Sequence, residues 1–453
     1  MNYLRSQRGA IIPLMLSMTL LLTALGFAIA SVTTANIKFI GHGQKSQAAL
    51  EIAEGGINYY LWHLSHNTTD YQDGTGAPAS PPYGPYEHDF LDSDGKKIGT
   101  YTLYVTPPTT GSTVTTVKSI GKVDGLNGTR TVQAQLGIPS FANYSLLTGT
   151  EVWFGVGENA NGPVHSNVGV HFDAVNNGTV TASNASYTPT GSFGGDGGPH
   201  NGVWGNGGPT AQWQYPVPTI DFSQVTADLQ NLKTQAQGSG VYLANTGAFS
   251  VNHGYYLVLK NNGTIDIYQV TNQASTGAIT TTFIRNQAAP VNGILYVDDN
   301  VWISGTYNKR ITVVSGRLPD VGSTNTSTTI YDNLTYTAQD GTVAVGLIAQ
   351  KDVAVARSAP NNLTINAALL AQKGHVWYPN YTGSNTKSNL TFYGAIASYD
   401  YWTWSWFSGS THTDGYLTST NTFDTNLTFS PPPLFPTTGS FTVLNWRELL
   451  TAP

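Results

Sequence analysis

A repeated segment in the C-terminal half constrains the fold more than any other feature of the sequence. Residues 347–355 (LIAQKDVAV) match residues 369–377 (LLAQKGHVW), residues 395–401 (AIASYDY) are a degenerate third copy, and residues 294–303 (ILYVDDNVWI) are a fourth. The first three copies start 22 and 26 residues apart. Periods of about 20–50 residues are typical of solenoids, in which each unit buries its apolar face on its neighbours. Because the units are strand-like and joined by polar turns, we predict a right-handed parallel β-helix.

The low charge of the chain agrees with such stacking. Asp, Glu, Lys and Arg make up 10% of the residues, against about 25% in ordinary soluble domains. Stacked rungs place like residues above one another, so repeated charges would repel, whereas Asn and Thr can form uncharged ladders. The 20 basic residues form no run in the body of the chain, which argues against nucleic-acid binding. The absence of cysteine excludes disulfides, thiolate catalysis and cysteine-bound metals.

The N-terminal segment predicts a long apolar helix. No charged residue occurs from Gly9 to Ile37, and the 23 residues of 10–32 would form about 35 Å of helix, enough to cross a bilayer core of about 30 Å. Arg5 and Arg8 precede the segment, so the N-terminus should stay cytoplasmic. Three interpretations fit: a secretory signal cleaved after residues 28–30 (AIA), a plain membrane anchor, or a longer helix. Apolar residues at helical spacing between positions 49 and 64 favour the longer helix.

The basic leader, the apolar helix and its amphipathic continuation resemble type IV pilins, and most closely the PilX-type minor pilins. The resemblance rests on Arg8-Gly9 followed by Ala10, and on residues 47–57 (QAALEIAEGGI). It implies that a prepilin peptidase cuts between Gly9 and Ala10 and that the helix packs in a filament core. Major pilins carry Glu at the fifth mature position, where this chain has Leu14. The resemblance therefore implies a minor or tip subunit.

The remaining sequence divides into a small head and a long β-rich body. Residues 67–97 are rich in turn-forming residues and are expected to form a loop, whereas residues 98–106, 114–123 and 129–138 alternate like the strands of an antiparallel meander. The predicted fold class is mainly β, with a long N-terminal helix, a small antiparallel pilin-like head and a β-helix. The predicted domains are a leader (1–9), a transmembrane or filament-core helix (10–66), an α+β head (67–140), a Gly/Asn-rich connecting region with a short helix at 221–236 (141–240), the β-helix (241–430) and a C-terminal cap (431–453).

The candidate binding residues form one aromatic segment near the end of the repeat. If residues 399–407 (YDYWTWSWF) are extended, Trp402, Trp404 and Trp406 lie on one face, because strand residues alternate between faces. An exposed tryptophan row would bind sugar rings or a partner protein, and the alternative is that these rings cap the apolar end of the solenoid. Tyr399 and Tyr401 complete this predicted surface.

Two catalytic or metal-binding hypotheses are weaker. Asp298-Asp299 with Arg310 or Arg317 could imitate a polysaccharide lyase site, but adjacent strand residues point to opposite faces and an Asp-Asp-Asn run is typical of a turn. His165, His171 and His200 have no metal-binding spacing, so hydrogen bonds to loop backbone are expected instead. We predict no metal, no cofactor and no enzymatic activity.

The sequence as a whole predicts a minor subunit of a type IV pilus-like filament, at the tip or within the shaft, that displays a β-helical surface for adhesion or partner binding. Its expected partners are other pilin subunits, the cytoplasmic membrane before assembly, and a glycan or cell-surface ligand. It is expected to begin as a membrane-anchored precursor and to end at the cell surface. The alternative is a membrane-anchored extracellular β-helical polysaccharide lyase or hydrolase.

Overall fold

The computed structural model describes residues 11–108, 112–125, 128–381, 385–438 and 441–450, and it divides into two compact units. Unit 1 comprises Met1–Pro107, Thr115–Leu136 and Val443–Pro453. Unit 2 comprises Pro108–Val114 and Gly137–Thr442. The predicted cleavage site, Gly9 and Ala10, lies outside the described residues.

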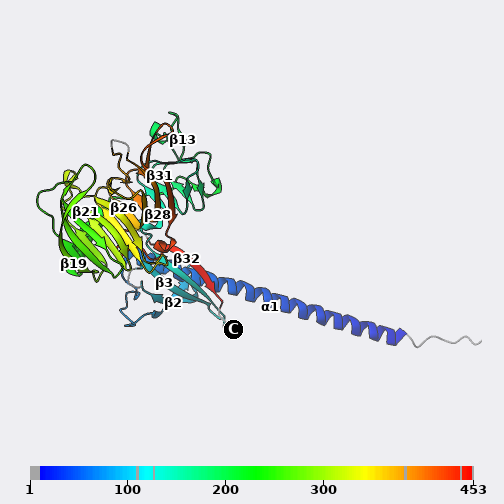
Figure 1. Cartoon of the computed structure of the whole chain (residues 1–453). Coiled ribbons are helices and arrows are strands. Elements are labelled where there is room, and N and C mark those ends of the chain that lie inside the picture. Colours follow the sequence, from blue (N-terminus) through cyan, green and yellow to red (C-terminus); the bar gives the residue numbers. More distant parts are fainter. Residues whose placement is uncertain (1–10, 109–111, 126–127, 382–384, 439–440, 451–453) are drawn as a thin grey trace, which may run out of the picture. The chain divides into compact units, whose positions relative to one another are not determined.

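Unit 1 begins with the long helix α1 (Ile11–His66), which has two contrasting halves (Figure 1). Within the described helices, Ile12–Ile37 is the one segment long and apolar enough to cross a membrane, with a mean hydropathy of 2.1 and no buried part. Its length and composition are compatible with a membrane anchor or a signal segment. The second half buries apolar side chains at helical spacing, namely Ala49, Ile52, Ala53, Ile57, Tyr60 and Leu64.

A five-stranded sheet completes unit 1, in the order β1-β2-β3-β4-β32. Its strands are β1 (Tyr83–Leu91), β2 (Lys97–Thr106), β3 (Val114–Val123), β4 (Thr129–Gly137) and β32 (Thr442–Leu449). The pairs β1–β2 and β2–β3 are antiparallel. At Gly121 a Cβ atom would lie 2.1 Å from the carbonyl oxygen of Ala49, so this glycine allows α1 to approach β3 closely.

The structure differs from the prediction at both ends of this sheet. The interval 67–97 was expected to be a loop, but β1 lies within it, because Tyr86 and Phe90 pair with β2 despite the neighbouring prolines. The tail 431–453 was expected to cap the repeat. Its strand β32 instead joins β4 and extends the sheet of unit 1.

Unit 2 is mainly β, and most of its strands pair in parallel (Figure 1). The first ladder runs in the order β16-β20-β22-β24-β26-β28-β5-β8-β11-β15. Its strands are β16 (Val241–Leu243), β20 (Ile294–Val297), β22 (Arg310–Ser315), β24 (Ala344–Ala349), β26 (Asn362–Ala371), β28 (Thr386–Ser398), β5 (Leu146–Thr148), β8 (Val164–Ser166), β11 (Val180–Ala182) and β15 (Trp213–Gln214). Residues 141–240 were expected only to connect two regions, yet they continue this ladder.

A second parallel ladder runs in the order β17-β21-β23-β25-β27-β29. Its strands are β17 (Gly254–Leu259), β21 (Asn300–Tyr307), β23 (Thr328–Tyr336), β25 (Val353–Val355), β27 (Val376–Trp377) and β29 (Trp402–Thr403). The other described strands of unit 2 are β6 (Val152–Phe154), β7 (Asn159–Ala160), β9 (Val170–Phe172), β10 (Val175–Asn176), β12 (Ser186–Tyr187), β13 (His200–Asn201), β14 (Val203–Trp204), β18 (Thr264–Gln273), β19 (Ile279–Ala288), β30 (Ser405–Ser408) and β31 (Thr411–Phe423).

The first ladder carries the sequence repeat in register. Leu347 pairs with Leu369, as the 22-residue spacing predicts. Leu369 pairs with Ile396, so the third copy is shifted by one residue from the predicted alignment. The fourth copy, at β20, is separated from β24 by strand β22, which the repeat did not predict because its sequence (RITVVS) lacks the repeat motif.

The first ladder is buried on both faces, which explains its continuous apolar runs. One set of its side chains, including Leu347 and Leu369, belongs to the core shared with the second ladder. The alternate set, including Ile348 and Leu370, packs in a second core with helix α2 (Gln224–Gly238). The predicted helix is confirmed, and its apolar face, Val225, Leu229 and Leu232, is buried in that core.

Candidate functional site

The predicted tryptophan row is not a single exposed face. Strand β29 ends at Thr403 and strand β30 begins at Ser405, so Trp404 lies between two short strands. Trp404 is only 3% exposed, packs in the core, and donates a hydrogen bond from Nε1 to Asn421 Oδ1 at 3.1 Å. Trp402 and Trp406 are half-buried. The prediction that the three rings share one open face is therefore wrong, because the chain turns between Trp402 and Trp406.

The structure instead brings Tyr401 and Trp406 together with His375 and Trp377, at strand β27. We call Trp377, Tyr401, Trp406 and His375 the Trp–Tyr cluster. The Tyr401 ring lies 4.3 Å from His375 and 6.3 Å from both Trp377 and Trp406 between ring centroids, in edge-to-face contacts. Such contacts are the favoured geometry for aromatic pairs. Tyr399 is 47% exposed but contacts Phe222 rather than the cluster.

His375 of the Trp–Tyr cluster contacts two carboxylates, those of Asp352 and Asp400. Its Nδ1 lies 3.3 Å from Asp352 Oδ1 and its Nε2 lies 3.2 Å from Asp400 Oδ2. The backbone N–H of His375 also donates to Asp352 Oδ1 at 2.9 Å. Both ring nitrogens therefore face carboxylates, which fixes the orientation of the imidazole within the cluster.

Asp352 makes this part of unit 2 sensitive to acid. Burial acts to raise the pKa of Asp352, but hydrogen bonds from His375 and the charge of Lys351 outweigh it and hold the pKa below the ordinary 3.8. A carboxylate with a lowered folded-state pKa stabilises the protein above its unfolded pKa, and this stability is lost as the pH falls through the folded value. We expect urea unfolding at pH 7 and pH 3 to show a smaller loss of stability in Asp352→Asn than in the wild type. An equal loss in both proteins would contradict this role.

A second aromatic group, which the sequence reasoning missed, lies across strands β6, β9 and β14. We call Trp153, His171, Trp204 and His200 the ring stack. Trp153 pairs in register with His171, and His171 with Trp204. Their centroids are 5.0 Å and 3.8 Å apart, and His200 covers the far face of Trp204 at 3.7 Å. The rings within the stack therefore cover one another's faces. Trp153, at one end of the stack, is 42% exposed to solvent.

Hydrogen bonds orient the rings of the ring stack, and Phe193 connects the stack to the Trp–Tyr cluster. Asp173 Oδ2 lies 3.0 Å from His171 Nε2 and accepts from Trp153 Nε1 at 3.2 Å. His171 Nδ1 lies 2.9 Å from the Phe193 carbonyl oxygen, and the Phe193 ring contacts Tyr401 edge-to-face at 6.2 Å. Phe193 therefore links the ring stack, through its carbonyl oxygen, to the Trp–Tyr cluster, through its ring.

A short repeat in the sequence could have revealed the ring stack. Residues 152–154 (VWF) and 170–172 (VHF) share a pattern in which a large ring lies between two buried apolar residues. Residues 203–204 (VW) repeat its first half. Three-residue units at unequal spacing are too short to be distinguished from chance matches in a Gly- and Asn-rich region.

The three candidate metal-binding histidines do not converge. His165 is buried, with Nδ1 at 2.9 Å from Thr181 Oγ1 and Nε2 at 3.1 Å from Asn167 Oδ1. Burial lowers its pKa. His171 and His200 belong to the ring stack, on opposite faces of Trp204. No group of three or more His, Cys, Asp or Glu suited to a metal occurs among the described residues.

The hypothetical lyase residues are also kept apart. Asp298 Oδ2 lies 2.9 Å from Lys233 Nζ and accepts from Tyr242 at 2.8 Å, while Asp299 Oδ2 accepts from the backbone and hydroxyl of Thr246. Arg317 donates to the carbonyl oxygen of Gly247. These bonds stabilise the connections around β20.

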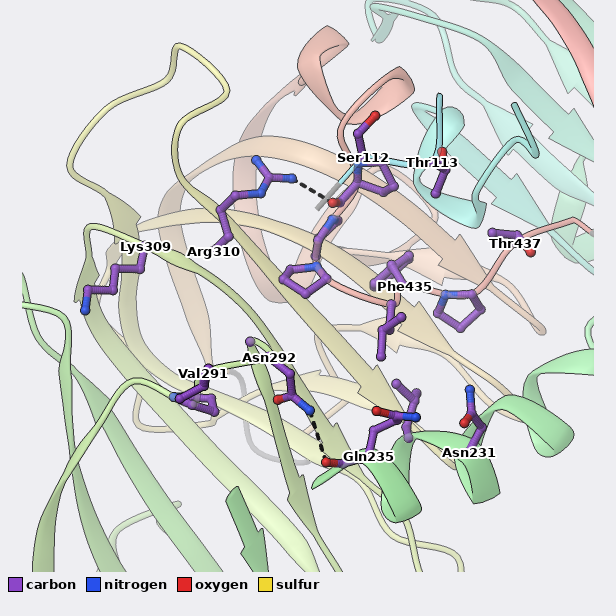
Figure 2. A pocket seen from close by; sticks show the side chains of 18 of the residues that line it. Ser112, Thr113, Asn231, Gln235, Val291, Asn292, Lys309, Arg310, Phe435 and Thr437 are labelled. Carbon is purple, nitrogen blue, oxygen red and sulfur yellow. Dashed lines mark hydrogen bonds between the residues drawn. The ribbon is translucent and has the colours of Figure 1, made fainter. Parts of the chain in front are cut away.

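Arg310, the second arginine of the lyase hypothesis, lines a cavity of about 770 Å³ in unit 2 (Figure 2). Arg310 donates to the carbonyl oxygens of Gly341, Ser430 and Pro431 at 2.6–2.7 Å, and burial lowers its pKa. Asn292 closes another side by donating to the Gln235 carbonyl oxygen. The described lining contains no acid or histidine. Arg310 thus anchors the proline-rich segment 431–437, and the cavity offers no acid–base pair.

The exposure of the tryptophans predicts their chemical reactivity. Trp153 is 42% exposed, whereas Trp404 and Trp302 are 3% and 1% exposed. Under native conditions we expect N-bromosuccinimide to oxidise Trp153 several-fold faster than Trp404 or Trp302, as measured by peptide mass spectrometry. A Trp404 that reacts as fast as Trp153 would restore the exposed tryptophan row and contradict the structure.

Comparisons with known proteins add little to these observations. No family model matches the chain, and no curated protein matches it. Among solved structures, it is similar to the crystal structure of the competence-associated pilin ComZ from Thermus thermophilus, with 13% identity, a TM-score of 0.27, and coverage of 90% of this chain and 98% of that chain. A similarity at this level carries no argument about function.

Proposed function

We propose that the chain is a minor subunit of a type IV pilus-like filament, located at its tip. The observation that carries this proposal is the division of α1 into the exposed apolar span Ile12–Ile37 and a second half that packs in unit 1. An apolar helix end that no other described residue buries needs either lipid or other helices around it. A membrane precursor followed by a filament core supplies both.

Unit 2 would then be the part that the filament displays. We interpret its two parallel ladders as the faces of a right-handed parallel β-helix, which the in-register stacking from β20 to β28 supports. Adhesion to a glycan or cell-surface partner would use the rings of the ring stack, of Phe193 and of the Trp–Tyr cluster. We assign no catalytic role to these rings. The expected partners are other pilin subunits through α1, and the expected location is the cell surface.

Labelling of surface filaments tests this proposal. We expect filaments sheared from native cells to contain the chain, and antibodies to unit 2 to label filament ends rather than the shaft in electron micrographs. Deletion of residues 11–37 should remove the label from filaments while the protein is still produced. Detection of the chain only in the membrane fraction, with no label on filaments, would contradict the proposal.

A further inference from the structure

A row of aromatic residues, separate from the ring stack and the Trp–Tyr cluster, crosses unit 2 on four adjacent strands, β21, β17, β18 and β19. It consists of Trp302, Tyr256, Tyr268 and Phe283, which we call the tyrosine strip. These residues lie directly opposite one another on the four strands. Neighbouring ring centroids are 5.8 Å apart between Tyr256 and Tyr268, and 5.3 Å apart between Tyr268 and Phe283. Exposure rises along the strip from 1% at Trp302 to 55% at Phe283.

The buried end of the strip opens on a small polar pocket of about 150 Å³. Trp302 lines this pocket together with Asn300, Ser327, Thr329 and Lys351. The indole Nε1 of Trp302 is buried and has no hydrogen-bond partner among the residues that the structure describes. Leaving a buried donor unpaired is unfavourable by about 1–3 kcal/mol, so native structures rarely do so without a reason. A buried, unpaired donor on a residue that lines a polar pocket points to a ligand with an acceptor oxygen.

The chemistry of the strip favours an uncharged ligand. Asp266, beside the strip on β18, is paired with Lys260 and accepts a hydrogen bond from Asn286. Lys351 in the pocket lies 3.7 Å from Asp352. Arg285 on β19 and Asp332 on β23 also lie near the strip, and they hydrogen-bond to the neutral side chain of Gln287 and to Asn333. The positive and negative charges around the strip therefore balance, and ring faces, hydroxyls and amides are the main groups that a ligand would meet.

We propose that the tyrosine strip and its pocket bind an uncharged linear glycan that lies across the strands. Pyranose rings have apolar C–H faces that stack on aromatic rings, and polar edges that form hydrogen bonds with side chains such as Asn300 and Ser327. Adjacent strands are about 4.8 Å apart, so the rings recur at nearly the length of one sugar unit in an extended chain. A terminal sugar at the pocket would supply the acceptor oxygen for Trp302 Nε1. This site does not depend on the chain being part of a filament.

Titration of the purified full chain with hexasaccharides tests the proposal. The probes are β-1,4-linked hexamers of glucose, N-acetylglucosamine, xylose and mannose, with hexagalacturonate as the charged comparison, and the readout is isothermal titration calorimetry. We expect at least one uncharged hexamer to bind and its affinity to fall about tenfold in Tyr256→Ala and in Phe283→Ala. Phe283 is more than half exposed, so its loss leaves the fold intact. Trp302→Phe keeps an aromatic ring but removes the donor, and should also weaken binding.

The control is Trp446→Ala, which removes a 44% exposed ring on β32 of unit 1, outside all the aromatic groups named above, and should bind the hexamer as the wild type does. The proposal is overturned if the wild type binds none of the uncharged hexamers, if it binds hexagalacturonate alone, or if Phe283→Ala binds with unchanged affinity. An equal loss in Trp446→Ala would also overturn it, because the loss would then not be specific to the tyrosine strip. Because titration uses the isolated chain, these outcomes are separate from those of the filament experiment.

Discussion

Replacement of Gly305 by alanine is expected to lower the free energy of unfolding of unit 2 by more than about 3 kcal/mol. Gly305 has a φ of +113°, a conformation that favours glycine, and it lies where the pairing of β21 with β23 shifts register. A Cβ atom there would lie 2.1 Å from the carbonyl oxygen of Leu259 on the next strand. The variant therefore combines backbone strain with a clash against the rigid ladder. Urea denaturation followed by circular dichroism measures the loss.

Two other glycines separate the strain from the clash. Gly247 has a φ of +123°, but a Cβ atom at this position would meet nothing within 4 Å, so Gly247→Ala should cost only the strain, about 1–2 kcal/mol. At Gly322 a Cβ atom would also meet nothing within 4 Å, and the φ is not positive. Gly322→Ala should therefore change stability by less than about 0.5 kcal/mol. If Gly305→Ala lowers the free energy of unfolding no more than Gly247→Ala does, strands β17 and β21 do not lie as close together as described.

Removal of residues 1–40 is expected to move the protein from the membrane fraction to the soluble fraction. The deletion takes away Ile12–Ile37, which is wholly exposed in the chain. It keeps the buried residues of the second half of α1, from Ala49 to Leu64. Ultracentrifugation of cell lysates measures the partition, and circular dichroism should show that the strands of both units remain folded.

A charge substitution distinguishes the apolar span from other exposed apolar residues. Leu22→Lys places a charge in the middle of the span, which costs about 2.5–3.5 kcal/mol of insertion free energy, and should weaken membrane association. Leu434→Lys changes an exposed leucine of unit 2 and should leave association unchanged. A truncated chain that stays with the membrane would show that α1 is not the anchor.

Much of the fold was predictable because burial imposes a visible pattern on the sequence. Leu347 and Leu369 occupy equivalent core positions on adjacent strands, so their surroundings repeat after 22 residues. Val225, Leu229 and Leu232 could be assigned to one helix face because that face packs on the first ladder. Strand β22 escaped detection because a core position accepts any apolar residue of suitable size, so Val313 replaces Leu without leaving a motif.

The aromatic sites were less predictable because they depend on register between distant segments. Alternation alone places Trp402, Trp404 and Trp406 on one face, but the turn between β29 and β30 buries Trp404. The tyrosine strip depends on the pairing of Tyr256 with both Tyr268 and Trp302. The Asn262-Gly263 turn that joins β17 to β18 is a local signal for the pairing of Tyr256 with Tyr268. No local pattern encodes the pairing of Tyr256 with Trp302, which lies on a strand far along the chain.

The proposal that this chain is a pilin-like subunit is tested most directly by mass spectrometry of the N-terminus of the protein isolated from native cells. We expect a mature chain that starts at Ala10, because a prepilin peptidase would cut after Gly9 and leave the apolar helix intact. A chain that starts at Ser31 would mean secretory cleavage and loss of the apolar span. An intact Met1 would mean a plain membrane anchor, and either result would contradict the proposal.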